Sequence, residues 1–315
     1  MTTTSRKTTK RTISPAEQAR RDADRQAKVE AAHTLLTEGI ANLTNSTQWT
    51  AMLTTAARFH HYSWRNCLMI LSQREDATRV AGYKTWQALG RQVRKGEPGI
   101  KIWAHITVWR DPKDSDPADT IDPKTGKVRR DGYRIEHVWD IAQTDGDPLP
   151  DTEQPRPTLL TGDAPDGLWD ALAAQVTALG YTLRRAAHPS SPDANGTTDP
   201  RNRTVYVRPD LNPAQAVKTL AHEIAHIRCG HTDPGQHTPR TRGEVEAESV
   251  AFVVASYFGL DTSDYTLAYV AGWAEDGKET EAVTETADTV IRVARQIIDD
   301  AEEHMTPDLP VAVGQ

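Results

Sequence analysis

The feature that most constrains this chain is the run His222-Glu223-Ile224-Ala225-His226, which has the form HExxH. Asn212 and Pro213 are a good N-cap and first helical residue, so the motif is expected on a helix that begins there. Two histidines four residues apart lie on one helical face, where both can bind one Zn²⁺. The sequence therefore predicts a zinc site of the metallopeptidase type, with His222 and His226 as ligands and Glu223 as the general base.

A catalytic zinc needs a third protein ligand and an open fourth position. Three glutamates, Glu244, Glu246 and Glu248, stand at the start of the next apolar helical pattern. Glu244 and Glu248 lie one turn apart on one face. We assign Glu244 as the third ligand and Glu248 as a carboxylate that holds the free ring nitrogen of a ligand histidine, with Glu248 as the alternative ligand. Glu246 is expected to face solvent.

Other interpretations of this region are open. Cys229 and His231 follow the motif and are alternative metal ligands, although packing at the helix end and solvent exposure also explain them. The motif could also be a surface helix whose histidines bind nothing, but the helix cap and the glutamate-rich segment argue against this. The two cysteines, Cys67 and Cys229, are expected to be free thiols because the chain shows no secretory signal.

The charge is distributed unevenly along the chain. The formal net charge is −7, which would argue against nucleic acid if it were spread evenly. Residues 79–110 instead contain seven Lys and Arg against one acid, and residues 261–315 contain 13 Asp and Glu against three Lys and Arg. Blocks of opposite sign indicate different partners for the two halves.

Within the basic block, aromatic and cationic residues interleave. Cations along the backbone and rings for base stacking are what sequence-independent binding of single strands requires. The candidate DNA-binding residues are Tyr83, Lys84, Trp86, Arg91, Arg94, Lys95 and Lys101, with Arg65 beside Trp64 as a further candidate. Trp86 is equally suited to anchor a core, because the chain has only three Phe.

Periodicity and turn residues predict an α+β fold with two domains. We expect a small α+β DNA-binding domain, a proline-rich linker, and a mainly helical zincin-like metallopeptidase domain. The DNA-binding domain is expected at 14–144, the linker at 145–167 and the metallopeptidase domain at 168–305. A disordered basic tail at 1–13 precedes them, and a tail at 306–315 follows. The main expected elements are helices at 14–37, 49–72, 82–90, 168–179, from 213 and at 281–303, and strands at 100–109, 133–141 and 204–207, with an exposed loop at 111–132.

Several segments resemble one family. HEIAH, the Gly/His/Pro-rich loop after it, and EVEAESVAFVVASYFGLDTSDYTLAYVAGWA resemble the C-terminal domain of ArdC-type antirestriction proteins, related to ImmA/IrrE- and SprT-like metallopeptidases. HYSWRNCLMILSQREDATRVAGYKTWQALGRQVRKGEPGIKI and VWDIAQTDGDPLP are similar to the family's N-terminal single-stranded-DNA-binding domain. The resemblance covers about residues 45–305.

The resemblance implies a protein that binds single-stranded DNA and protects incoming plasmid or phage DNA from host restriction. By carry-over, His222 and His226 bind Zn²⁺, Glu223 activates water and Glu244 completes the site. Two alternatives stay open: an ImmA-like regulatory metallopeptidase that cleaves a DNA-bound repressor, or a DNA-binding module with a non-catalytic zinc site. Tyr257 and Tyr265 are both available to stabilise an oxyanion. We expect a cytoplasmic protein with a possible protein substrate and no membrane partner.

Overall fold

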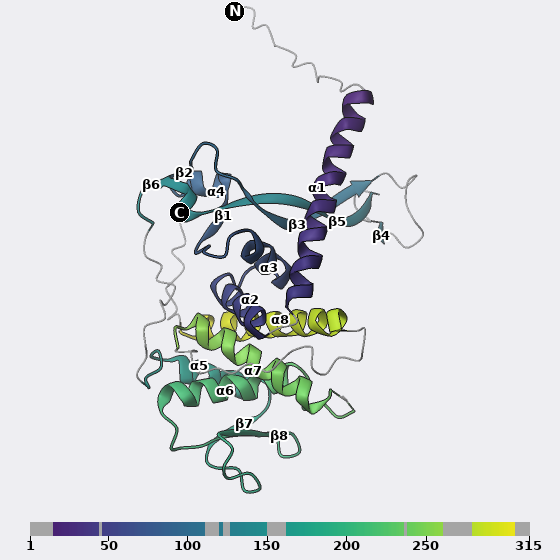
Figure 1. Cartoon of the computed structure of the whole chain (residues 1–315). Coiled ribbons are helices and arrows are strands. Elements are labelled where there is room, and N and C mark those ends of the chain that lie inside the picture. The colour runs from purple at the N-terminus through teal and green to yellow at the C-terminus, as the bar shows by residue number, and fades with distance from the viewer. Residues whose placement is uncertain are drawn as a thin grey trace, which may run out of the picture.

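The computed structural model describes residues 15–43, 46–110, 120–121, 127–149, 162–235, 238–260 and 279–305. Helices and strands occur in both halves of the chain, so the predicted α+β class is confirmed. In Figure 1 the N-terminal half, with its long antiparallel ribbon, lies above the C-terminal half, and a layer of helices lies between that ribbon and the strands of the C-terminal half. Among the described residues, no helix combines the length and apolar composition needed to cross a bilayer.

The N-terminal half combines four helices with an antiparallel sheet. Strand β5 is central in that sheet and pairs with β1, β3 and the short β4, and the ladder between β3 and β5 runs from Ile100 opposite Val138 to Arg110 opposite Val128. A second, two-stranded sheet pairs β2 with β6. The elements are α1 (Pro15–Asn42), α2 (Ser46–Arg58), α3 (Trp64–Gln73), β1 (Val80–Gly82), α4 (Tyr83–Ala88), β2 (Arg91–Val93), β3 (Ile100–Arg110), β4 (Thr120–Ile121), β5 (Val128–Asp140) and β6 (Thr144–Gly146).

One predicted helix is wrong in this half. The expected helix at 49–72 is two helices, because the chain leaves helical geometry before Ser63. Ser63 is extended and its hydroxyl accepts a hydrogen bond from the N–H of Asn66 at 3.3 Å, which caps α3. The strand expected at 133–141 begins five residues earlier, at Val128. Ser14, the expected cap of the first helix, lies outside the described residues.

The C-terminal half packs helices on a three-stranded sheet. Its strand order is β7-β9-β8, with β7 parallel and β8 antiparallel to β9. The predicted strand β9 and the predicted start of α6 are confirmed, and the side chain of Asn212 accepts a hydrogen bond from the N–H of Gln215 at 2.8 Å. The elements are α5 (Leu168–Ala178), β7 (Thr182–Arg185), β8 (Gly196–Asp199), β9 (Thr204–Val207), α6 (Pro213–Arg228), α7 (Arg240–Tyr257) and α8 (Glu279–Met305).

The two halves share one continuous apolar core. Helix α2 of the first half packs against α7 of the second, and α1 and α3 reach α8 (Figure 1). Two buried tryptophans bridge the halves by hydrogen bonds: Trp49 Nε1 donates to Ser249 Oγ at 3.1 Å, and Trp64 Nε1 donates to Asp288 Oδ1 at 2.5 Å. The helix that carries HExxH is therefore anchored in a core to which both halves contribute.

Candidate metal centre and candidate DNA-binding face

Three candidate ligand atoms converge between α6 and α7. The Nε2 atoms of His222 and His226 lie 3.1 Å apart, and Oε2 of Glu244 lies 3.5 and 3.7 Å from them. Metal–ligand bonds of 2.0–2.1 Å in tetrahedral geometry place ligand atoms about 3.3 Å apart. The spacing and the chemistry of these donors therefore fit one zinc-sized ion.

The packing of α6 explains this placement. Leu220, Ile224 and Ala221 on one side of the helix are buried in the core. His222 and His226 lie on the remaining side, where α7 faces them, and each keeps less than a fifth of its side chain exposed. Half of the Glu244 side chain is exposed, at 51%, so the site is open to solvent on that side. A catalytic site needs such an opening for water and substrate.

Two of the three glutamates of α7, Glu244 and Glu248, contact different atoms of His222. Glu248 contacts the Nδ1 atom at 3.1 Å, and Glu244 faces the Nε2 atom. The other oxygen of Glu248 lies 3.6 Å from the ammonium group of Lys218. Because Nδ1 and Nε2 point away from each other, this geometry favours Glu244 as the ligand and Glu248 as the carboxylate behind it.

The carboxylates make this site favourable for a cation. Burial lowers the pKa of His222, but hydrogen bonds to Glu244 and Glu248 outweigh burial and raise it to about 9. Hydrogen bonds from His222 and His226 hold the pKa of Glu244 well below its usual range. Burial raises the pKa of Glu248, but His222 and Lys218 lower it by more. Positive charge is therefore stabilised where the three ligand atoms meet.

Glu223 is buried and held from the neighbouring strand. Its Oε2 accepts a hydrogen bond from Thr198 Oγ1 at 2.7 Å, and only 5% of the residue is exposed. The strand approaches this closely because Gly196 has no side chain: a Cβ there would lie 2.8 Å from Glu223 Oε1 and 2.5 Å from Thr219 Cγ2. Sequence reasoning missed Thr198, because no strand was predicted at residues 196–199, where β8 lies.

The expectation that Glu246 faces solvent is wrong. Only 3% of the residue is exposed, because Glu246 Oε2 lies 2.9 Å from His231 Nε2 and Oε1 accepts from Arg242 Nε at 2.8 Å. Nor is His231 exposed, since its Nδ1 lies 3.0 Å from Nδ1 of His226. Cys229 lies in the same cluster, and burial raises the pKa of its thiol to about 12. Cys67 and Cys229 are free thiols, as predicted.

Several predicted DNA-binding residues make contacts within the fold. Trp86 is fully buried and its Nε1 donates to the carbonyl of Trp139 at 2.9 Å, so it is a core anchor. The guanidinium of Arg91 donates to Thr144 Oγ1 and to the carbonyls of residues 144, 146 and 147. Arg65 pairs with Asp288 at 3.3 Å, at the junction of the halves. These three residues are occupied by structural contacts.

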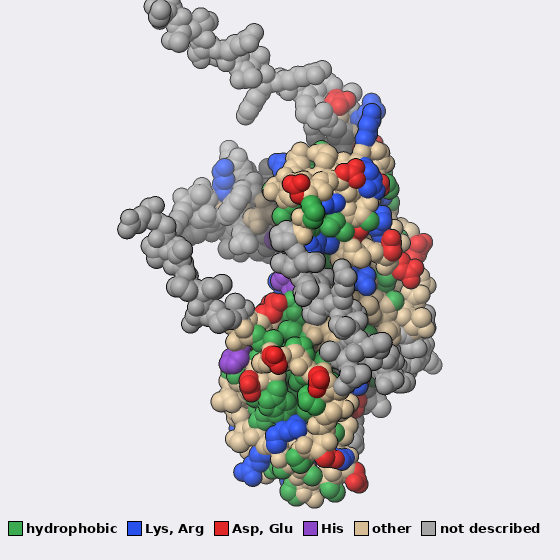
Figure 2. Space-filling model, turned by 90° about the vertical axis from the view of Figure 1, so that its left-hand side faces the viewer, with side chains coloured by type: hydrophobic (Ala, Val, Ile, Leu, Met, Phe, Trp, Pro, Cys, Tyr) green, Lys and Arg blue, Asp and Glu red, His purple; other side chains and the backbone are tan. Residues whose placement is uncertain are grey.

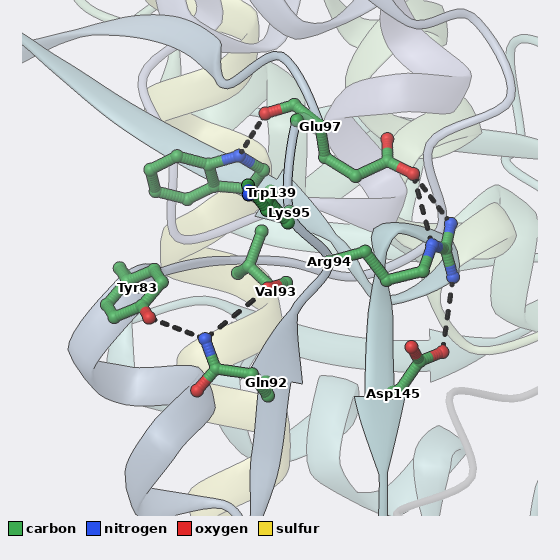
Figure 3. Close-up of a pocket in the computed structure, with 9 residues that line it drawn as sticks. Tyr83, Gln92, Val93, Arg94, Lys95, Glu97, Trp139 and Asp145 are labelled. Atoms are coloured by element: carbon green, nitrogen blue, oxygen red, sulfur yellow. Dashed lines mark hydrogen bonds and ion pairs between the residues drawn. The ribbon is translucent and has the colours of Figure 1, made fainter.

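Three of the other candidates, Tyr83, Arg94 and Lys95, line a shallow pocket of about 670 Å³ (Figure 3). Tyr83, 41% exposed, meets Trp139 edge to face with ring centroids 6.0 Å apart, and Lys95 lines the same pocket. Arg94 also lines it, with its guanidinium held by Glu97 and Asp145. Lys84 is exposed and Lys101 is half-buried on β3. Trp139 lies in the segment VWDIAQTDGDPLP, but it was not predicted from the sequence as a DNA-binding residue.

Ion pairs weaken the basic character expected from the sequence. On the face shown in Figure 2, Lys and Arg side chains of the N-terminal half are interspersed with Asp and Glu. The pairs of Arg94 with Glu97 and Asp145 and of Arg134 with Glu136 are examples. On this face the basic side chains of the N-terminal half therefore do not form a continuous positive surface.

Sequence comparisons identify both halves. A sequence model of the N-terminal domain of anti-restriction factor ArdC matches residues 27–138, and a model of the IrrE N-terminal-like domain, a peptidase family, matches residues 177–290. The uncharacterized protein pXO2-81 of Bacillus anthracis is 23% identical over 282 residues, which are 79% of this chain and 47% of that protein. The chain therefore spans about half the length of this relative.

Two solved structures are also similar. The metal-free crystal structure of the antirestriction ArdC protein from plasmid R388 shares 23% identity and a TM-score of 0.49, covering 77% of this chain and 86% of that chain. The Mn(II)-bound structure of the same protein shares 21% sequence identity with a TM-score of 0.44, covering 77% of this chain and 88% of that chain. The order of the two matched sequence models gives this chain the architecture of the ArdC-type antirestriction proteins, in which an ArdC N-terminal domain precedes an IrrE-like domain of a peptidase family.

Proposed function

We propose that this chain is an antirestriction protein that binds single-stranded DNA and carries a zinc peptidase site. The observation that carries the peptidase part is the triangle of His222 Nε2, His226 Nε2 and Glu244 Oε2, with Glu223 next to His222. An antirestriction role for incoming plasmid or phage DNA places the protein in the cytoplasm, where host restriction acts. The substrate class is a protein segment.

The roles of the residues follow from their positions. A bound zinc ion supplies Lewis acidity to a water and to the scissile carbonyl. Glu223 takes the proton of the attacking water and returns it to the leaving amine, so that no net proton is lost. Thr198 holds one carboxylate oxygen of Glu223 and thereby restricts its rotamer. Glu248 fixes the ring of His222 from the opposite side.

The position of β8 supports an extended substrate. Strand β8 is at the edge of its sheet, and through Thr198 and Gly196 it contacts the proposed general base. An edge strand can pair with an extended peptide through main-chain hydrogen bonds. A protein segment bound in this way would run past Glu223, which makes an extended region of the substrate the expected cleavage site.

The DNA-binding part is carried by the pocket between α4 and β5. Tyr83 and Trp139 present aromatic rings there and Lys95 presents a cation, which is the combination that single strands require. We propose Tyr83, Trp139, Lys84, Lys95 and Lys101 as the contact residues. Arg94 lines the same pocket and contributes its positive charge there. Trp86, Arg91 and Arg65 are left out because their side chains are occupied by structural contacts.

The metal site is tested by metal analysis of the purified protein. The wild type is expected to bind one zinc ion per chain, and His226→Ala is expected to lose it, because two remaining ligands hold zinc poorly. His188→Ala is the control, since that histidine lies in the same half but outside the triangle. A wild-type protein without metal after loading with zinc would leave only the DNA-binding part of the proposal.

DNA binding is tested by fluorescence anisotropy with a labelled single strand. The affinity is expected to fall steeply with salt, and Lys95→Glu is expected to weaken it further, because phosphate contacts release counterions. Tyr83→Ala is expected to cost about 1–3 kcal/mol through lost base stacking. Arg65→Ala serves as the control, because Arg65 is paired with Asp288 at the junction. Salt-independent binding, or a preference for duplex, would contradict the proposal.

A further inference from the structure

The Nδ1 atom of His226 begins a hydrogen-bond network that continues through His231 and Glu246 to Arg242. His226 Nδ1 lies 3.0 Å from Nδ1 of His231, and His231 Nε2 lies 2.9 Å from Glu246 Oε2. The other oxygen of Glu246 accepts a hydrogen bond from Arg242 Nε at 2.8 Å. The side chains of His231 and Glu246 are 8% and 4% exposed, so these two side chains are largely shielded from water.

The backbone places His231 beside His226. Gly230 has φ +79, a left-handed conformation that favours glycine, and it ends the helix just after Cys229. The N–H of His231 then donates to the carbonyl of His226 at 3.0 Å. The turn thus returns His231 under the last turn of α6, where its ring meets that of His226 with centroids 5.1 Å apart.

The proton positions along this chain are determined if His226 binds a metal through Nε2. Its ring proton must then be on Nδ1, so His226 donates to Nδ1 of His231. His231 therefore carries its own proton on Nε2 and donates it to the carboxylate of Glu246. Each donor meets an acceptor, and Arg242 donates to the remaining oxygen, so no group in the chain is left without a partner.

We propose that His231 is a positioning residue of the metal centre, a role that rests on the proposed metal site. By accepting the proton of His226 Nδ1, His231 selects the tautomer that presents Nε2 to the metal and holds the ring in place. Glu246 and Arg242 hold His231 in turn. The two ligand histidines are thus supported differently, with a carboxylate directly behind His222 and a histidine–carboxylate pair behind His226.

The competing arrangement is a second metal ion among Cys229, His231 and Glu246, whose ligand atoms lie within 4.8 Å of one another. That ion would compete with the contacts already present, since His231 uses both nitrogens and Glu246 both oxygens. The two arrangements predict different stoichiometries. A positioning role leaves one zinc per chain, whereas a second site gives two, one of which is lost with His231.

Zinc affinity of His231 variants, measured by competition with a chelator, tests the proposal. His231→Leu is expected to lower the affinity about 10–100-fold. His231→Asn is expected to recover most of this loss, because its side-chain oxygen can accept the proton of His226 Nδ1. Cys229→Ser, in the same cluster, is the control and should bind zinc like the wild type. Thermal unfolding of the metal-free variants separates a general structural effect from an effect on the metal.

An unchanged affinity in His231→Leu, or two zinc ions in the wild type of which one is lost in this variant, would overturn the proposal. If His231→Leu does not fold, the ring ¹⁵N shifts of zinc-loaded wild type decide the matter, because a proton on Nδ1 of His231 excludes the proposed chain. A wild type that binds no zinc refutes the metal site itself, and the proposal with it.

Discussion

Glu223→Gln is expected to abolish peptide hydrolysis while the metal stays bound. The amide has nearly the shape of the carboxylate, and its oxygen can still accept the hydrogen bond from Thr198. It cannot take a proton from water, and the loss of a general base typically costs about 10²–10⁴-fold in rate. Because Glu223 lies outside the triangle of ligand atoms, zinc content should be unchanged.

This variant also separates the proposed roles of the protein. Zinc content and the rate of cleavage of unstructured protein substrates are measured beside the wild type, with the exposed Glu281→Gln as a control for the loss of one charge. Loss of cleavage together with loss of antirestriction assigns the biological role to the peptidase. Antirestriction that survives in Glu223→Gln would assign that role to DNA binding and contradict a role of the peptidase activity in antirestriction.

Trp49→Ala is expected to lower the free energy of unfolding by about 3–5 kcal/mol. Trp49 is fully buried on α2, and its indole fills space against α7 of the other half. The substitution removes that apolar contact and also leaves Ser249 Oγ, itself fully buried, without the donor that it has at 3.1 Å. Both effects act at the junction, so the stability of the C-terminal half should fall with that of the N-terminal half.

Urea denaturation followed by circular dichroism measures this effect. Trp49→Phe keeps most of the buried area and loses the hydrogen bond, so we expect about 1–3 kcal/mol. Tyr133→Ala is the surface control, because Tyr133 is 66% exposed and such changes cost about 0.5 kcal/mol or less. A loss below about 1 kcal/mol in Trp49→Ala would show that the halves do not depend on this contact.

The features that could be predicted from sequence depend on residues close together in the chain. Asn212 and Pro213 begin the helix that carries His222 and His226. The start of this helix and the common face of the two histidines therefore follow from helix geometry alone. The strand at 100–109 was likewise evident from its alternation, and the structure extends it by one residue. The assignment of Glu244 as the third ligand depends on how two helices pack, which the sequence does not state. The structure favours Glu244 because Glu248 contacts the opposite nitrogen of His222.

The remaining features were decided only by tertiary contacts. Trp86 and Trp139 are residues of the same type in the N-terminal half, yet the fold buries the first and leaves the second at a pocket. Arg65 lies beside Trp64 in the sequence, but its partner Asp288 is more than 200 residues away. Glu246 faces inward because His231 and Arg242 compensate for its burial. A sequence pattern states the type and spacing of side chains, whereas exposure and hydrogen bonding depend on partners that only the folded chain brings within reach.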